Sequence, residues 1–356
     1  MTCHCLPLTC RLAWSCAAAA AVWLTTTTAQ AQTQAGAVPA TDTVILAPRA
    51  EASGRIVVSG RIIDYTGAAL VLEAATGGKQ TIPGGQVVEV RSTWNAEQIA
   101  GDELWRRRDY AAAQARYAAA LAAEQRRWAR RFAQSKLIAC LREQDRWEQA
   151  TEEFLRLVRD DPSTPYFYAI PLPWTTVVPN PTLEAKARAW SADATPNVAA
   201  LLGASFLMAT SERTAAMKRL RELALDGDQR IALLAEAQLW RSAAVTADNS
   251  AVESWERLLD KLPETLRAGP ALVVGRAWAQ RNEPERAALL LLRVPILYPD
   301  QHRLAAEALW SGGQMLEKMS QPAEAATLYR ELLRDYPRAL VAGPAADRAK
   351  ELSAKP

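Results

Sequence analysis

Cysteine and histidine are common nucleophiles and metal ligands in proteins, and this sequence holds few of them. It has five cysteines and two histidines in 356 residues, and all except Cys140 and His302 fall within residues 1–31. Beyond those residues a single Cys and a single His form neither a disulfide, nor a zinc site, nor an evident catalytic dyad. We therefore expect no enzymatic activity, no metal and no cofactor. Cys140 is predicted to be a buried small hydrophobe and His302 to be exposed in a turn after Pro299.

Residues 1–31 have the features of a secretory signal peptide. Arg11 precedes a short apolar run, and Ala29 and Ala31 place small residues where a signal peptidase cuts. We expect cleavage after Ala31, so that the mature chain crosses the inner membrane, becomes periplasmic or extracellular, and holds no transmembrane helix. A lipid anchor on Cys16 or a retained signal is the alternative.

The mature chain is predicted to be close to neutral. The formal net charge of the whole chain is +3, and the signal carries a single charge, which leaves +2. Such a balance gives no reason to expect a nucleic-acid partner. Two local basic clusters, residues 106–108 and 126–131, suit an anionic partner such as a lipid headgroup or a polysaccharide. The alternative is a solvated helix face whose charge is compensated by Glu124, Glu143 and Asp145.

Small, aromatic and proline residues recur at one spacing through most of the chain. In residues 321–337, Ala325 is followed by an aromatic residue four positions later, a leucine three after that, and a closing Pro337. Six copies fit this pattern, and they start near residues 94, 131, 197, 232, 268 and 306. A small alanine lets two helices approach closely, an aromatic fills the space beside it, and proline ends the second helix. The pattern predicts an array of stacked helix pairs.

This pattern resembles the tetratricopeptide repeat over about two thirds of the chain. The resemblance implies an α-solenoid of about six helix pairs, each packed on the next. The last two copies also look like the repeats of secreted bacterial envelope proteins. The chain departs from the family pattern in two ways. The intervals between copies exceed the usual length of about 34 residues. Three copies have Ile138, Ala204 or Leu239 at the position where the three others have glycine.

Two segments depart from the regular array. Residues 162–181 are rich in proline, which excludes a regular helix. This insertion carries four aromatic residues: Tyr166, Phe167, Tyr168 and Trp174. They either form a partner-binding loop or seal the solenoid by packing on it, and we favour sealing because exposed aromatic clusters promote aggregation. In residues 111–144 we expect a turn near Gln125, with one fused helix as the alternative.

A small β-barrel is predicted for residues 42–93. Five β-branched runs alternate with glycine- and proline-rich turns, at residues 43–47, 55–63, 68–74, 79–82 and 86–91. Closure into a barrel would remove the exposed edges of such short strands. The segment is similar to SH3-like and Sm-like barrels, and we expect it to dock or cap rather than to bind RNA.

The predicted fold is therefore mainly α-helical, a tetratricopeptide-like α-solenoid of about six helix pairs preceded by a small five-stranded β-barrel. The predicted segments are a signal peptide (1–31), a disordered lead-in (32–41), the β-barrel (42–93), two repeats (94–161), the insertion (162–181), a helix with four repeats (182–337), and a capping helix with a tail (338–356).

In tetratricopeptide arrays the partner usually lies in the concave groove lined by the first helix of each pair. Transferring those groove positions gives seven partner-binding candidates: Trp105, Phe132, Arg142, Trp240, Arg276, Trp310 and Gln314. Aromatic and arginine side chains are common interface anchors, and the alternative is that the tryptophans pack between adjacent repeats. The family's carboxylate-binding residues are not matched, because Gln98 and Asp102 occupy two of those places.

These observations favour a secreted, non-enzymatic scaffold that binds a protein or peptide partner on its repeat surface. One alternative is a cell-envelope assembly component that handles outer-membrane proteins or peptidoglycan. A second alternative is the accessory array of an enzyme complex, although no region outside the array is large enough for a catalytic domain.

Overall fold

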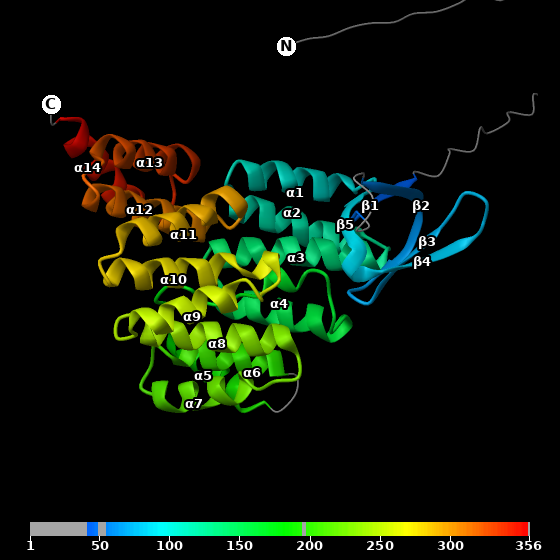
Figure 1. Ribbon diagram of the computed structural model, residues 1–356. Coiled ribbons are helices and arrows are strands. Elements are labelled where there is room, and N and C mark those ends of the chain that lie inside the picture. The colour runs from blue at the N-terminus through cyan, green and yellow to red at the C-terminus, as the bar shows by residue number, and fades with distance from the viewer. Residues whose placement is uncertain (1–40, 49–54, 194–196, 355–356) are drawn as a thin grey trace, which may run out of the picture. The chain divides into compact units, whose positions relative to one another are not determined.

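The structure is a computed structural model that describes residues 41–48, 55–193 and 197–354. Within them the chain forms a five-stranded antiparallel sheet followed by 14 α-helices (Figure 1). The predicted mainly helical fold with an amino-terminal β-segment is confirmed. The predicted signal peptide and all of the lead-in before Thr41 lie outside the described residues.

Five strands near the predicted positions build the sheet. They are β1 (Asp42–Leu46), β2 (Ile56–Tyr65), β3 (Ala69–Glu73), β4 (Lys79–Pro83) and β5 (Val87–Arg91). The strand order is β4-β3-β2-β1-β5, and every neighbouring pair is antiparallel. The long β2 serves both halves of the sheet, because its first half pairs with β1 and its second half with β3.

The prediction of a closed barrel is wrong. β4 and β5 are the two edge strands, and no pairing joins them within the described residues. The β5 edge instead borders a hollow of about 740 Å³, where Val88 and Val90 lie with Trp94, Phe132 and Tyr166. Side chains from outside the sheet thus lie along an edge that closure would otherwise have covered.

Twelve of the helices form six consecutive pairs. The pairs are α1 (Ala96–Arg106) with α2 (Tyr110–Ala123), α3 (Arg127–Glu143) with α4 (Trp147–Asp160), α6 (Asn197–Leu207) with α7 (Arg213–Leu223), α8 (Gln229–Ala243) with α9 (Asn249–Leu259), α10 (Ala268–Gln280) with α11 (Pro284–Leu297), and α12 (His302–Lys318) with α13 (Pro322–Asp335). The other two are α5 (Pro181–Ala192) and α14 (Ala342–Ser353). Helix α2 ends at Ala123 and helix α3 begins at Arg127, which confirms the predicted turn near Gln125.

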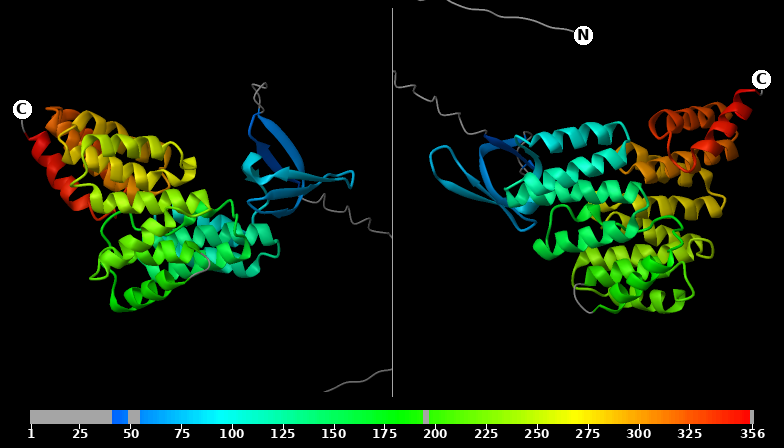
Figure 2. Two further views of the ribbon diagram at one scale, coloured as in Figure 1. Left: turned by 60° about the horizontal axis from the view of Figure 1, so that its bottom comes forward. Right: turned by 180° about the vertical axis from the view of Figure 1, so that it is seen from behind.

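The helices stack in chain order, as Figures 1 and 2 show. Each of α10, α11, α12 and α13 packs on the helix before it and on the helix after it. The first helices of successive pairs also contact one another, α6 with α8, α8 with α10, and α10 with α12. A continuous row of first helices therefore runs through the second half of the chain.

Four of the turns within pairs share one backbone conformation. Arg108, Asp145, Asn282 and Ser320 have φ values of 63°, 57°, 58° and 59°, and each lies two residues before its second helix. A non-glycine residue seldom adopts this left-handed conformation, although Asn and Asp tolerate it better than others. Its recurrence at one position indicates a repeated structural unit.

Small residues let the two helices of a pair touch. A Cβ added to Gly313 would lie 2.3 Å from Cε1 of Tyr329, and one added to Gly101 would lie 2.7 Å from Cε1 of Tyr117. Both tyrosine rings are fully buried. The predicted burial of Ala325 at the helix crossing is confirmed, since none of it is exposed.

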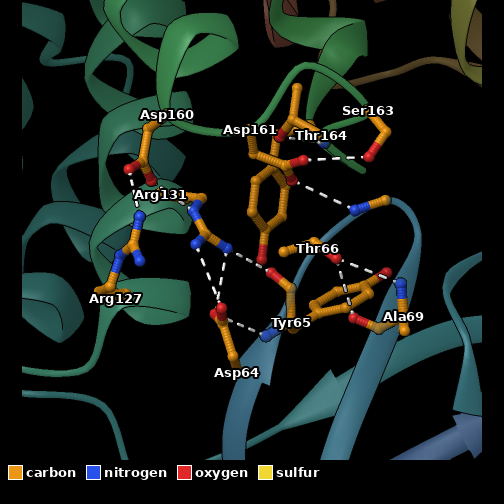
Figure 3. A network of polar contacts seen from close by, with 12 residues as sticks. Asp64, Tyr65, Thr66, Ala69, Arg127, Arg131, Asp160, Asp161, Ser163 and Thr164 are labelled. Atoms are coloured by element: carbon orange, nitrogen blue, oxygen red, sulfur yellow. Dashed lines mark hydrogen bonds and ion pairs between the residues drawn. The ribbon is translucent and has the colours of Figure 1, made fainter. Parts of the chain in front are cut away.

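A buried arginine joins the sheet to the helices (Figure 3). Arg131 on α3 is 3% exposed, and its Nη1 donates to the carbonyl oxygen of Tyr65 at 2.7 Å. The same guanidinium forms ion pairs with Asp64 of β2 at 3.1 Å and with Asp160 of α4 at 2.6 Å. The guanidinium has counter-charges on both sides, so it fixes the end of β2 against α3 and α4.

The insertion packs on neighbouring elements. Tyr166 and Phe167 are buried, and Tyr168 and Trp174 are half-buried. A Cβ added to Gly269 of α10 would lie 2.2 Å from the Trp174 ring, so only glycine leaves room for this indole. On the other side, the Tyr166 ring meets Tyr65 of β2 edge-on, with ring centroids 6.2 Å apart.

Candidate functional site

Three of the predicted partner-binding residues lie together. Arg276, Trp310 and Gln314 line an open hollow of about 590 Å³ between α10 and α12. These two first helices contact each other, which brings residues more than 30 positions apart to one surface. Gln314 is exposed and Trp310 is half-buried, so both side chains are available to a partner.

The geometry of this hollow combines an aromatic wall with charge. The Trp310 ring is supported by Tyr329, with centroids 5.2 Å apart and planes tilted by 40°. Arg276 pairs with Glu307 at 2.5 Å, and Lys318 adds a second positive charge to the lining. The hollow therefore offers an apolar surface beside donors, which is the usual composition of a peptide-binding surface.

Two other predicted positions belong to packing interfaces. Trp105 is 8% exposed, and its ring stacks on His302 with centroids 4.6 Å apart. Trp240 is 2% exposed, and it stacks on Trp255 of the partner helix α9 at 5.5 Å. These contacts bury Trp240 within its own helix pair and Trp105 against the last pair, whereas the alternative had placed the tryptophans between adjacent repeats.

Phe132 and Arg142 lie in separate places. The Phe132 ring stacks on Trp94 at 4.7 Å, at the hollow beside β5. Arg142 donates from Nη2 to Oε1 of Gln301, at the start of α12. Burial lowers the pKa of the Arg142 guanidinium and raises the pKa of the neighbouring Glu143 carboxyl. The seven candidates thus divide among several surfaces rather than forming one continuous groove.

Cys140 is buried, as predicted. None of its surface is exposed, and it lies on α3 among core side chains. Burial raises the pKa of its thiol, so the reactive thiolate is disfavoured at neutral pH. Its role in the fold is that of a small hydrophobe.

The prediction that His302 is exposed is wrong, since it is 3% exposed. Tyr110 lies 2.7 Å from its Nδ1, and Arg108 hydrogen-bonds to its Nε2. A guanidinium can only donate, so Nε2 accepts and the proton of the neutral imidazole sits on Nδ1, which donates to the Tyr110 hydroxyl oxygen. Burial and the nearby Arg108 charge lower the pKa of His302 to about 3.

His302 belongs to a contact between the first and the last helix pairs. Nε of Arg108 donates to the carbonyl oxygen of Asp335 at 2.7 Å, and Arg338 donates to the carbonyl oxygen of Arg108 at 3.0 Å. Arg303 pairs with Asp145 in the α3–α4 turn. In the sequence, the basic cluster at residues 106–108 is only a weak signal for this contact.

Most charges of the two basic clusters are paired within the chain. Arg126 pairs with Glu124 at 2.7 Å, as the predicted compensation requires. Arg127 pairs with Asp160 at 2.6 Å. In the other cluster, Arg106 and Arg107 share one carboxylate, that of Glu103. These pairs favour the interpretation as compensated helix faces over that of a binding site for an anionic partner.

A second hollow, of about 350 Å³, was missed by the sequence reasoning. It adjoins the α10–α12 hollow, because Arg276 lines both. Arg213 and Arg241 also line it, together with Trp174 of the insertion. The positions of these arginines carry no repeat signal, and the insertion that completes the hollow is irregular.

No protein-family model matches the chain, and none of the curated proteins matches it significantly.

Across residues 41–48, 55–193 and 197–354, no cluster of three or more His, Cys, Asp or Glu could hold a metal ion. In the same part of the chain no helix is both long and apolar enough to cross a membrane.

Proposed function

We propose that the chain is a non-enzymatic scaffold that binds a protein segment along α10 and α12. The observation that carries the proposal is the open hollow in which Arg276, Trp310 and Gln314 lie together. Tryptophan and arginine are the residues most often found at energetic centres of interfaces. Each wall of the hollow is a helix held by its neighbours, so a partner would meet a preorganised surface.

We further propose that the helix pairs are tetratricopeptide-type repeats. Support comes from the row of first helices and from the shared left-handed turn in four of the pairs. The close approach of Gly101 to Tyr117 and of Gly313 to Tyr329 also fits a small residue facing an aromatic one at the helix crossing. In such an array the first helices line the surface on which partners bind.

Photo-crosslinking tests the proposed partner surface. A photoreactive amino acid is placed at Gln314 of the full chain, which is then irradiated in a native cell-envelope fraction. Gln314 is exposed, so the probe leaves the core intact. The control carries the same probe at Leu289 on α11, which is 68% exposed and does not line the hollow. We expect a defined protein adduct from position 314 alone, and the same adduct in equal yield from both positions would contradict the proposal.

Export of the chain is part of the same proposal. The pattern of Arg11, the apolar run and Ala29 with Ala31 predicts that the mature protein begins at or near Gln32. Amino-terminal sequencing of the native protein checks this. A mature protein that begins with an acylated Cys16 would instead show a lipid anchor.

A further inference from the structure

The 350 Å³ hollow has an unbalanced charge. It lies between the insertion and helices α7, α8 and α10, and its lining contains Arg213, Arg241 and Arg276. No Asp or Glu is among the described residues that line it. Arg276 pairs with Glu307, which lies outside this lining, whereas Arg213 and Arg241 form no ion pair with the described residues.

Arg241 is held in this hollow by neutral groups. Its Nη1 donates to Oε1 of Gln238 at 2.5 Å and to the carbonyl oxygen of Ser205 at 3.4 Å, and its Nη2 donates to the carbonyl oxygen of Thr175 at 3.2 Å. Burial lowers the pKa of its guanidinium to about 10. A cation withdrawn from water without a counter-charge is costly, so a carboxylate entering the hollow would gain a strong, charge-assisted interaction.

Two buried side chains near this arginine keep donor atoms without a partner in the described structure. Nε2 of Gln238 is buried without a partner in the described structure, as are Nε and Nη2 of Arg281 at the end of α10. Nη1 of Arg281 donates at 2.8 Å to the carbonyl oxygen of Ala244, a residue that lines the hollow. Neither Gln238 nor Arg281 lines the hollow, so the exposed donors that an anionic ligand would meet there are those of the lining arginines.

The other two arginines of the lining come from α7 and α10. Arg213 begins α7, is exposed, and forms no ion pair with the described residues. Arg276 lies where the hollow meets the α10–α12 hollow. Together the two hollows carry three arginines and Lys318 against one carboxylate, that of Glu307. The joined surface is therefore complementary to a negatively charged chain.

We propose that the 350 Å³ hollow binds a side-chain carboxylate of an acidic peptide segment, which continues along the α10–α12 hollow. The inference rests on the proposed function and names the chemistry of the partner. Apolar side chains of Val178, Met208 and Val273 share the lining with the arginines. They suit the methylene groups of a glutamate better than a bare inorganic anion, and the joined hollows suit an extended chain.

Fluorescence anisotropy with defined peptides tests this inference on the full chain. The probe is a labelled poly-glutamate peptide with an amidated carboxyl terminus, and poly-glutamine of equal length is the neutral control. We expect poly-glutamate to bind and poly-glutamine not to bind, with an affinity that falls as salt rises. A peptide that binds only when its terminal carboxylate is free would overturn the assignment to side-chain carboxylates.

Two matched variants locate the binding. Arg213→Gln should weaken poly-glutamate binding by about threefold or more, whereas Arg221→Gln, an equally exposed arginine on the same helix outside the hollow, should leave it unchanged. Arg241→Gln should weaken it by about tenfold or more, and circular dichroism checks that this variant, at a half-buried position, is folded. Equal losses for Arg213→Gln and Arg221→Gln would show non-specific charge attraction and overturn the proposal.

Two further outcomes keep this inference separate from the scaffold proposal. If the wild-type protein does not bind poly-glutamate while position 314 still cross-links a native partner, the proposal of an acidic ligand is contradicted. The proposal of a protein-binding scaffold is then still supported. In a competition experiment, inorganic phosphate and glutarate are each added to displace the labelled peptide. Displacement by phosphate at a lower concentration than by glutarate would show that the hollow binds phosphate, and would overturn the proposal of a peptide ligand.

Discussion

His302 stays neutral in the folded protein because Arg108 bonds to its Nε2 and Trp105 covers its ring. Protonation would place a second positive charge against the guanidinium and would remove the acceptor that Arg108 needs. The imidazole thus acts as a neutral connector between the α1–α2 turn and α12. This arrangement makes His302 an identifiable contributor to the pH dependence of the free energy of unfolding.

The pH dependence has a definite sign. The pKa of His302 is about 3 in the folded chain, against the ordinary value of 6.5. Between these two pH values the unfolded chain binds more protons than the folded chain, so the free energy of unfolding decreases as pH falls, by up to about 1.4 kcal/mol per pH unit. Above pH 7 this residue contributes no slope.

Urea unfolding of wild type and His302→Gln at pH 7 and pH 5 measures this contribution. Glutamine has no titrating group, so the variant should lose less stability on acidification than wild type does. Carboxylates titrate alike in both proteins and cancel in the comparison. Equal losses for the two proteins would show that His302 is not held in its neutral form.

Local pattern sufficed to predict some of these residues and not others. Ala325 lies at a position that is alanine in every copy, so its burial followed from the spacing, and the burial of Cys140 followed from its residue type. His302 contacts Arg108, which is 194 positions away, and Arg241 is held by Thr175, 66 positions away in the irregular insertion. A repeat pattern encodes contacts between adjacent helices and says nothing about such distant partners.

At the scale of elements, the sequence predicted the helix pairs and strands well and the closure of the sheet badly. The predicted strand at residues 55–63 became Ile56–Tyr65, and the turn near Gln125 separates α2 from α3. Alternating β-branched residues reveal strands, but they do not reveal what lies along an edge. The edge at β5 borders Trp94, Phe132 and Tyr166, which come from later parts of the chain.

Glycine at the helix crossing provides a test of the pair geometry. Gly313→Ala places a Cβ at 2.3 Å from the Tyr329 ring, which is fully buried and bonded through its hydroxyl to Glu317, so the ring has little room to move. We expect a loss of about 1–3 kcal/mol in the free energy of unfolding.

The matched control is Gly343→Ala in α14, where an added Cβ meets nothing within 4 Å. Its stability should not fall, and it should rise by up to about 1 kcal/mol because alanine favours a helix more than glycine does. Chemical unfolding of both variants gives the comparison. A Gly313→Ala protein as stable as the control would mean that α12 and α13 do not approach as closely as described.

At the scale of the whole molecule, the contact between the first and last pairs sets this chain apart from a linear array. In a linear solenoid each repeat touches only its neighbours. Here Arg108, Tyr110 and Trp105 from the first pair meet His302 and Asp335 from the last. The two ends of the helical array should therefore stabilise each other.

Hydrogen exchange on the full chain tests this coupling. His302→Ala removes the stacking on Trp105 and the bonds to Arg108 and Tyr110, so amides in α1 and α2 should exchange faster than in wild type. Amides in α6 and α7, which lie away from the contact, should be unaffected and serve as the internal control. Unchanged protection in α1 and α2 would show that the first pair is stable without the last.

Two tryptophan variants measured side by side test the proposal that the partner binds in the hollow between α10 and α12. Trp310→Ala should abolish retention of the partner that cross-links at position 314, and should lower stability by only about 1 kcal/mol, because one aromatic contact is lost. Trp240→Ala, which removes a buried ring, should lower stability by about 3–5 kcal/mol. A folded Trp310→Ala protein that retains this partner as well as wild type does would show that the partner does not bind in this hollow.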